Sequence, residues 1–170
     1  MSHRRMMMIQ TQEEEKVKEW KLLYDSGETT EEITSTADID ISGNDELVVI
    51  AKAVPTATNS EVRNGQLVIT DQGGNRCKLV LGNKLLSNSG NPRLSVAAIR
   101  KVLDFAYAET ATSYNAADVF DGKNAVDNLT AMQNSVAKLN NAFAKIRITN
   151  LNDVTAYKFG IGSRFVIFGR

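Results

Sequence analysis

Apolar and polar residues alternate along several stretches of the chain. In "EEITSTADIDI", Ile33, Ile39 and Ile41 occupy odd positions with polar residues between them. One side of such a stretch can be buried while the other faces water, which predicts a strand of an antiparallel sheet. Residues 20–24 and 145–149 show the same alternation and predict two further strands.

Four other runs have apolar residues at both odd and even positions and would present apolar side chains on both faces. They span residues 47–54, 67–69, 79–81 and 165–168. Strands of this composition need cover on both sides. Turn-forming residues interrupt the first ninety residues at intervals of about 8 to 16 residues, which is typical of an all-β sandwich or barrel. The pattern therefore predicts a mainly β protein, an antiparallel β-sandwich that forms a jelly-roll-like knob.

The pattern is ambiguous between residues 95 and 144. Ile99 and Leu103 would lie on one face of a helix, yet apolar residues also alternate from position 97 to position 107. Residues 125–144 place apolar residues at helical spacing, but the four asparagines among them disfavour a helix. One helix within 95–144 and an all-strand structure both stay open.

The length of the chain is sufficient for one domain with a hydrophobic core, since it has 170 residues. Residues 1–16 differ from the rest because a basic pair and an apolar run precede three glutamates without a turn signal. Methionine-rich segments form adaptable contact surfaces. We therefore predict an N-terminal docking tail or short helix over 1–16, with a frayed terminus as the alternative, and a β-sandwich domain over 17–170.

Charge and cysteine content argue against several kinds of partner. Twenty Lys and Arg residues balance twenty Asp and Glu residues, so we expect neither nucleic-acid binding nor attraction to an acidic membrane. No stretch approaches the roughly 18 apolar residues of a membrane helix, and the N-terminal apolar run is too short for a signal peptide. The single Cys77 cannot form an intrachain disulfide and is typical of a reducing compartment. We expect a soluble protein made in the cytoplasm, with Cys77 in its core.

The residues that catalysis usually needs are scarce. The only histidine, His3, lies in the N-terminal tail, which argues against a serine-type triad. His3 and Cys77 are too few for a zinc site, and the glycine-rich loops that bind phosphate do not occur. We therefore predict no catalytic residue, no metal and no cofactor.

The stretch "DIDISGNDE" is the strongest candidate for a metal site. Asp38, Asp40 and Gly43 match the start of an EF-hand calcium loop, but Val49 stands where that loop needs a bidentate glutamate. A strand that ends in a hairpin turn at Gly43-Asn44 is the preferred interpretation.

Glycoside hydrolysis needs only two carboxyl groups, which twenty acidic residues can supply. Sugar binding would also need exposed aromatic side chains, whereas most aromatic residues of this chain fall in predicted strands. We predict that Trp20 is part of the core and not a sugar-stacking platform. A carbohydrate-binding or glycoside-cleaving surface protein stays the alternative function.

Several stretches resemble small virion proteins of bacteriophages from gut and other Gram-positive hosts, of the fibre-head, head-fibre and capsid decoration type. They are the start "RRMMMIQTQEEE", the segment "EWKLLYDSGETTEEITSTADIDISGNDELVVIAKAV", and the closing "KIRIT" and "GIGSRFVIFGR". The resemblance is clearest over 17–54 and 145–170. The Ala-rich sequence within 95–144 departs from the mainly β pattern of that group.

This resemblance implies a non-enzymatic virion protein, made in the host cytoplasm. Its expected partners are two further copies in a homotrimer, other virion proteins of the capsid or tail, and a host cell-surface glycan as receptor. The predicted virion-docking residues are Arg4, Arg5, Met6, Met7, Met8 and Ile9. On the terminal strand, Phe165 and Ile167 would face the sandwich interior while Val166 and Phe168 would contact a neighbouring subunit.

Overall fold

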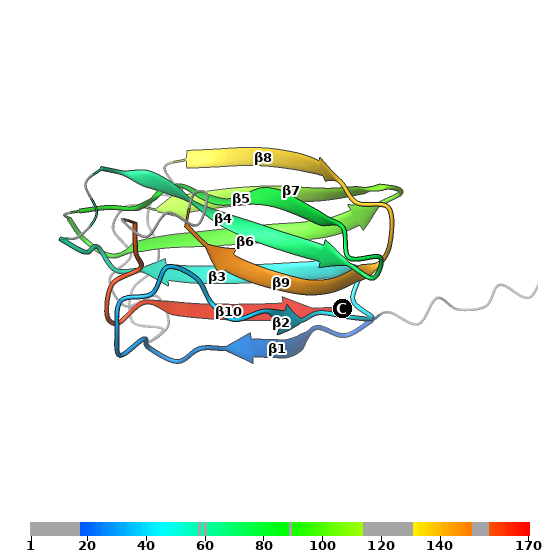
Figure 1. Ribbon diagram of the computed structural model, residues 1–170, viewed down its shortest axis with the longest axis horizontal. Coiled ribbons are helices and arrows are strands. Elements are labelled where there is room, and N and C mark those ends of the chain that lie inside the picture. The colour runs from blue at the N-terminus through cyan, green and yellow to red at the C-terminus, as the bar shows by residue number, and fades with distance from the viewer. Residues whose placement is uncertain (1–17, 58, 60, 89, 114–130, 151–156) are drawn as a thin grey trace, which may run out of the picture.

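The structure is a computed structural model that describes residues 18–57, 59, 61–88, 90–113, 131–150 and 157–170. Within these residues it is built of strands and contains no helix (Figure 1). The strands are β1 (Lys21–Asp25), β2 (Ile39–Asp40), β3 (Glu46–Ala53), β4 (Arg63–Asp71), β5 (Arg76–Leu86), β6 (Arg93–Val102), β7 (Phe105–Ser113), β8 (Ala131–Lys138), β9 (Phe143–Thr149) and β10 (Arg164–Gly169).

The strands form two antiparallel sheets that pack against each other (Figure 1). The larger sheet has the order β1-β10-β3-β6-β7-β8, and the smaller sheet has the order β2-β9-β4-β5. The predicted antiparallel β-sandwich is confirmed. Its described strands divide into six and four, whereas a jelly roll has eight strands.

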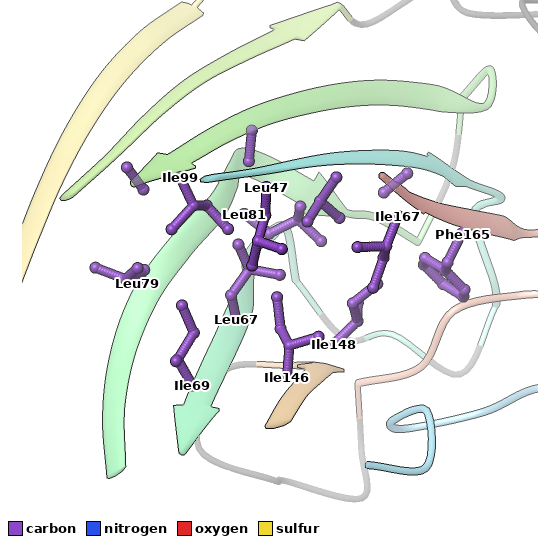
Figure 2. Packing of buried hydrophobic residues seen from close by; sticks show 14 of the residues in the cluster. Leu47, Leu67, Ile69, Leu79, Leu81, Ile99, Ile146, Ile148, Phe165 and Ile167 are labelled. Atoms are coloured by element: carbon purple, nitrogen blue, oxygen red, sulfur yellow. The ribbon is translucent and has the colours of Figure 1, made fainter. Parts of the chain in front are cut away.

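Alternation along the strands places the core between the sheets. In β3, Leu47, Val49 and Ala51 are buried while the residues between them are half-buried. β4 shows the same pattern, with Leu67 and Ile69 inside. Figure 2 shows that these leucine and isoleucine side chains from the two sheets gather in one cluster. Burial of one apolar face per sheet is therefore what holds the layers together.

The region that the sequence left open forms strands wherever the structure describes it. β6, β7 and β8 are successive neighbours in the larger sheet, and β9 lies in the smaller sheet. A helix is therefore not formed over 95–113 or 131–144, and residues 114–130 lie outside the described residues.

A two-residue turn between β6 and β7 changes which residues of this region face the core. Val102 pairs with Phe105 across the turn. Ala106 and Ala108 are therefore buried, and Phe105 and Tyr107 lie on the outer face of the sheet. The alternation expected from 97 to 107 is wrong beyond the turn because the turn shifts its phase by one residue.

The apolar terminal strand β10 lies inside the larger sheet, where it pairs with β1 on one side and β3 on the other. Phe165 and Ile167 are completely buried, as expected. The rings of Phe159 and Phe165 meet edge to face with centroids 4.9 Å apart. Pairing continues past the strand, since the Arg170 backbone N–H donates to the Glu46 carbonyl at 3.0 Å. An internal position in a sheet explains much of the apolar composition of this strand within one chain.

The turn at residues 42–43 differs from the expected hairpin at Gly43-Asn44. It links β2 of the smaller sheet to β3 of the larger sheet, so it is an arch between layers. Gly43 has a φ of 78°, a conformation that glycine adopts without steric cost. The side-chain amide of Asn44 donates to the carbonyls of Ile41 and Ser42, at 3.1 Å each, and so fixes the arch.

The smaller sheet closes onto the larger sheet along β5. The backbone N–H of Val80 donates to Ser135 Oγ of β8 at 3.2 Å, and the Ser95 hydroxyl of β6 donates to the carbonyl of Leu81. Gly82 permits this approach, because a Cβ at that position would lie 2.7 Å from Ser95 Oγ. Side chains of the larger sheet thus bind backbone groups at the edge of β5.

Candidate functional site

The clearest surface feature is a group of exposed apolar side chains at one end of the larger sheet. Val102, Leu103, Phe105 and Val136 are 48%, 85%, 45% and 60% exposed. They lie at the β6–β7 turn and on the neighbouring strand β8, and we call them the tip cluster. Contiguous exposed apolar side chains typically mark an interaction surface.

Leu103 is held in an unusual backbone conformation at the centre of the tip cluster. Its φ is 52°, in the left-handed region, where two-residue hairpin turns favour Gly, Asn or Asp. A bulky apolar residue with such a φ costs roughly 1–2 kcal/mol. Leu103 therefore combines backbone strain with an exposed apolar side chain, and the fold of a single chain benefits from neither. Such strain is characteristic of functional positions.

Strand register places a shallow groove next to the tip cluster. Glu46, Arg100, Tyr107 and Val136 form one row across β3, β6, β7 and β8. The next row on this face contains Val48, Ala98 and Glu109. Because Ala98 is small, the surface is hollowed there, and a groove of about 230 Å³ results. Arg100 and Tyr107 line both this groove and the hollow over the tip cluster, so the two are contiguous.

The C-terminal residue and Trp20 close one end of the groove. Arg170 Nε donates to Glu46 Oε2 at 2.5 Å, and its guanidinium lies over the Trp20 ring, 4.7 Å from the centroid. Trp20 is 44% exposed, so the prediction that it is part of the core is wrong. The prediction assumed that residues 20–24 alternate without a break. The pairing of β1 with β10 has an irregularity between Leu22 and Tyr24, so the residues before and after it do not follow one alternation.

A second arginine and aromatic pair lies at the other end of the groove. The Arg100 guanidinium is 5.3 Å from the centroid of the Tyr107 ring. The Tyr107 hydroxyl donates to Glu109 Oε1 at 2.9 Å, and this hydrogen bond, with burial, raises the pKa of Tyr107. Each aromatic residue of the groove is thus paired with a guanidinium, and both glutamates have a donor.

The structure places the predicted subunit-contact residues on the same face as this surface. Phe168 pairs with Val48, which lines the groove, and its side chain is half-buried. Val166 is 5% exposed and offers little area to another subunit. The contact of Val166 and Phe168 with a neighbouring subunit stays a prediction. The predicted virion-docking residues 4–9 lie outside the described residues.

Two carboxylates of the candidate calcium loop accept hydrogen bonds from other groups of the chain. Asp38 accepts a hydrogen bond from Arg147 Nε at 2.8 Å, and this contact holds the pKa of Asp38 below its usual value. Asp40 Oδ1 accepts from the Ser42 backbone N–H at 2.9 Å, which lowers the pKa of Asp40. Asp40 therefore stabilises the start of the arch, and Asp38 joins the segment before β2 to β9 within the smaller sheet.

Chemistry elsewhere in the described part of the chain is sparse. No three of its His, Cys, Asp and Glu residues are grouped so that they could hold a metal ion. Cys77 is buried in the core, as predicted, and burial raises the pKa of its thiol to about 11. In the part of the chain that the structure describes, no helix is long and apolar enough to cross a membrane.

Sequence reasoning missed the tip cluster and the groove. The only local signal for the tip is "VLDF", in which no glycine or asparagine marks the turn. No protein-family model matches the chain, and no curated protein is similar to it. We therefore infer its function from the fold, from this surface and from the stretches that resemble virion proteins.

Proposed function

We propose that the protein is a non-enzymatic structural protein of a bacteriophage particle. It assembles as a homotrimer, attaches to the capsid or tail through residues 1–16, and presents its β-sandwich as a fibre head, decoration or receptor-binding knob. The observation that carries this proposal is the tip cluster, because a lone subunit has no use for four exposed apolar side chains around a strained turn. An assembly of several subunits can bury these side chains at the contacts between them.

The electrostatics of the described residues also support a structural role. Asp25 accepts two hydrogen bonds from Arg164, and Asp38 is bound to Arg147. Glu46 is bound to Arg170 in the same way. The arginines hold the pKa of Asp25 and that of Asp38 below their usual values, whereas a general acid needs a carboxyl group whose pKa is raised.

Attachment is tested by deleting residues 1–16. We expect the truncated protein to fold and to form the same oligomer as the full chain, yet to be absent from purified particles when it is supplied in place of the full chain. Circular dichroism and sedimentation check the first expectation, and immunoblots of purified particles check the second. Normal incorporation of the truncated protein would refute docking through this segment.

A sugar-binding or glycoside-cleaving protein is the second candidate, because the groove brings two glutamates together with Trp20 and Tyr107. One observation weighs against it. Guanidinium groups lie over both rings, where a sugar would have to stack. Release of reducing sugar from host polysaccharide, abolished by Glu46→Gln or Glu109→Gln, would favour this candidate instead.

A further inference from the structure

We propose that the groove binds the Leu103 side chain of a second copy of this chain, so that a tip-to-groove contact joins the subunits. This inference rests on the oligomer proposed above and identifies its interface. The tip provides a projecting apolar side chain, 85% exposed. The groove provides a hollow of about 230 Å³ over Ala98, which has room for one leucine side chain.

The composition of the groove matches that of a protein interface. Its floor contains Val48 and Ala98, and its rim carries Trp20, Tyr107 and two arginines. Tryptophan, tyrosine and arginine are the residue types that contribute most to binding at interfaces. An apolar centre with a polar rim is the usual arrangement of such contacts.

Charge supports a second copy as the occupant. The groove is lined by two arginines, Arg100 and Arg170, and two glutamates, Glu46 and Glu109, so its formal charges cancel. The tip that enters the groove is apolar apart from the exposed Asp104 next to Leu103, whose carboxylate can pair with an arginine of the groove.

The position of the tip fits closure into a ring. Tip and groove are different surfaces, so each subunit donates one tip and accepts another, which is the head-to-tail contact that generates rings. They share Arg100 and Tyr107 as lining residues, so both lie around one point of the larger sheet. In the proposed trimer, this part of the larger sheet would lie next to the axis of the ring.

The test measures the mass of the full chain by sedimentation over a range of concentrations. Leu103→Asn removes the apolar side chain and leaves a residue that tolerates positive φ, while Ala98→Trp fills the hollow from the exposed side. We expect each variant to lower the self-association constant by about ten- to a hundredfold, the effect of exposing one leucine-sized side chain. Ile161→Asn is the matched control, since Ile161 is 62% exposed in a turn at the opposite end of the sheet, and it should associate like the wild type.

Thermal unfolding separates association from folding. A merely structural role of Leu103 predicts no loss of association. We expect Leu103→Asn to associate more weakly, while its monomer is at least as stable as the wild-type monomer because the strain is relieved. If the wild type is oligomeric and both variants associate normally, or if the control dissociates equally, the tip-to-groove contact is wrong and the proposed oligomer stands. A wild type that is monomeric at all concentrations overturns both the tip-to-groove contact and the proposed oligomer. Incorporation into particles tests the virion role independently.

Discussion

Gly82 is the position at which one added methyl group should test how the two sheets close. A Cβ at Gly82 would lie 2.7 Å from Ser95 Oγ, 2.9 Å from Ser95 Cβ and 2.9 Å from Thr112 Oγ1. Favourable contacts between heavy atoms need about 3.5–4.0 Å. In Gly82→Ala the two sheets must therefore move apart locally, or the two side chains must rotate.

Both responses are costly because the neighbours are fixed. Ser95 is buried and its hydroxyl donates to the Leu81 carbonyl, so rotation leaves a buried polar group without its partner. Overpacking costs about 1–3 kcal/mol, and a buried unsatisfied group costs about 1–3 kcal/mol. We expect Gly82→Ala to lower the free energy of unfolding by about 2–4 kcal/mol, which lowers the Tm by roughly 4–16 °C at this chain length.

Gly65 provides a matched control because it is the direct partner of Gly82 in the β4–β5 pair. A Cβ at Gly65 would meet the end of the Leu85 side chain at 2.6 Å, and a flexible side chain can move away. Both substitutions remove the same backbone freedom from the unfolded chain. Urea unfolding followed by circular dichroism should show a clearly larger loss for Gly82→Ala, and Ser95→Gly should restore part of it. Equal stability of the two alanine variants would refute the proposed close approach of the sheets.

Three further predictions concern the core and the pH dependence of stability. At pH 8 the thiolate fraction of native Cys77 should be roughly two-hundredfold below that of an unfolded thiol with a pKa of about 8.5, so alkylation should be slow until the protein is unfolded. Burial raises the pKa of Asp71, but hydrogen bonds from two asparagines outweigh this effect and lower it. The stability that Asp71 contributes is therefore present above about pH 4 and lost as the pH falls through its lowered pKa. Urea titrations should find that Asp71→Asn destabilises the protein less at acid pH than at neutral pH. A difference in stability between wild type and variant that does not change with pH would contradict this. Phe165→Ala should lower the free energy of unfolding by about 3–5 kcal/mol and Phe168→Ala by about half as much, since only Phe165 is fully buried. Equal losses in urea unfolding would contradict this, because they would show that both faces of β10 are equally buried.

Parts of the site could not be predicted because they join residues that are distant in the sequence. Glu46 lies beside Arg100, and Trp20 beside Arg170, only because β3 pairs with β6 and β1 pairs with β10. Trp20 was expected in the core because alternation assumes an unbroken strand, and the irregularity of β1 broke it. Leu103 looked like a residue of a continuous apolar pattern until the turn placed it at the surface.

The sequence by itself determined that the chain forms strands, and that these strands pack as an antiparallel sandwich with Phe165 and Ile167 inside. It could do so because the period of burial along a strand is a local property, visible in each short segment such as residues 47–54. Only the tertiary structure decided the order of the strands, the arch at Gly43 and the union of the tip cluster with the groove. These features depend on which strands become neighbours, and that choice is made by the packing of the whole core and not by any one segment.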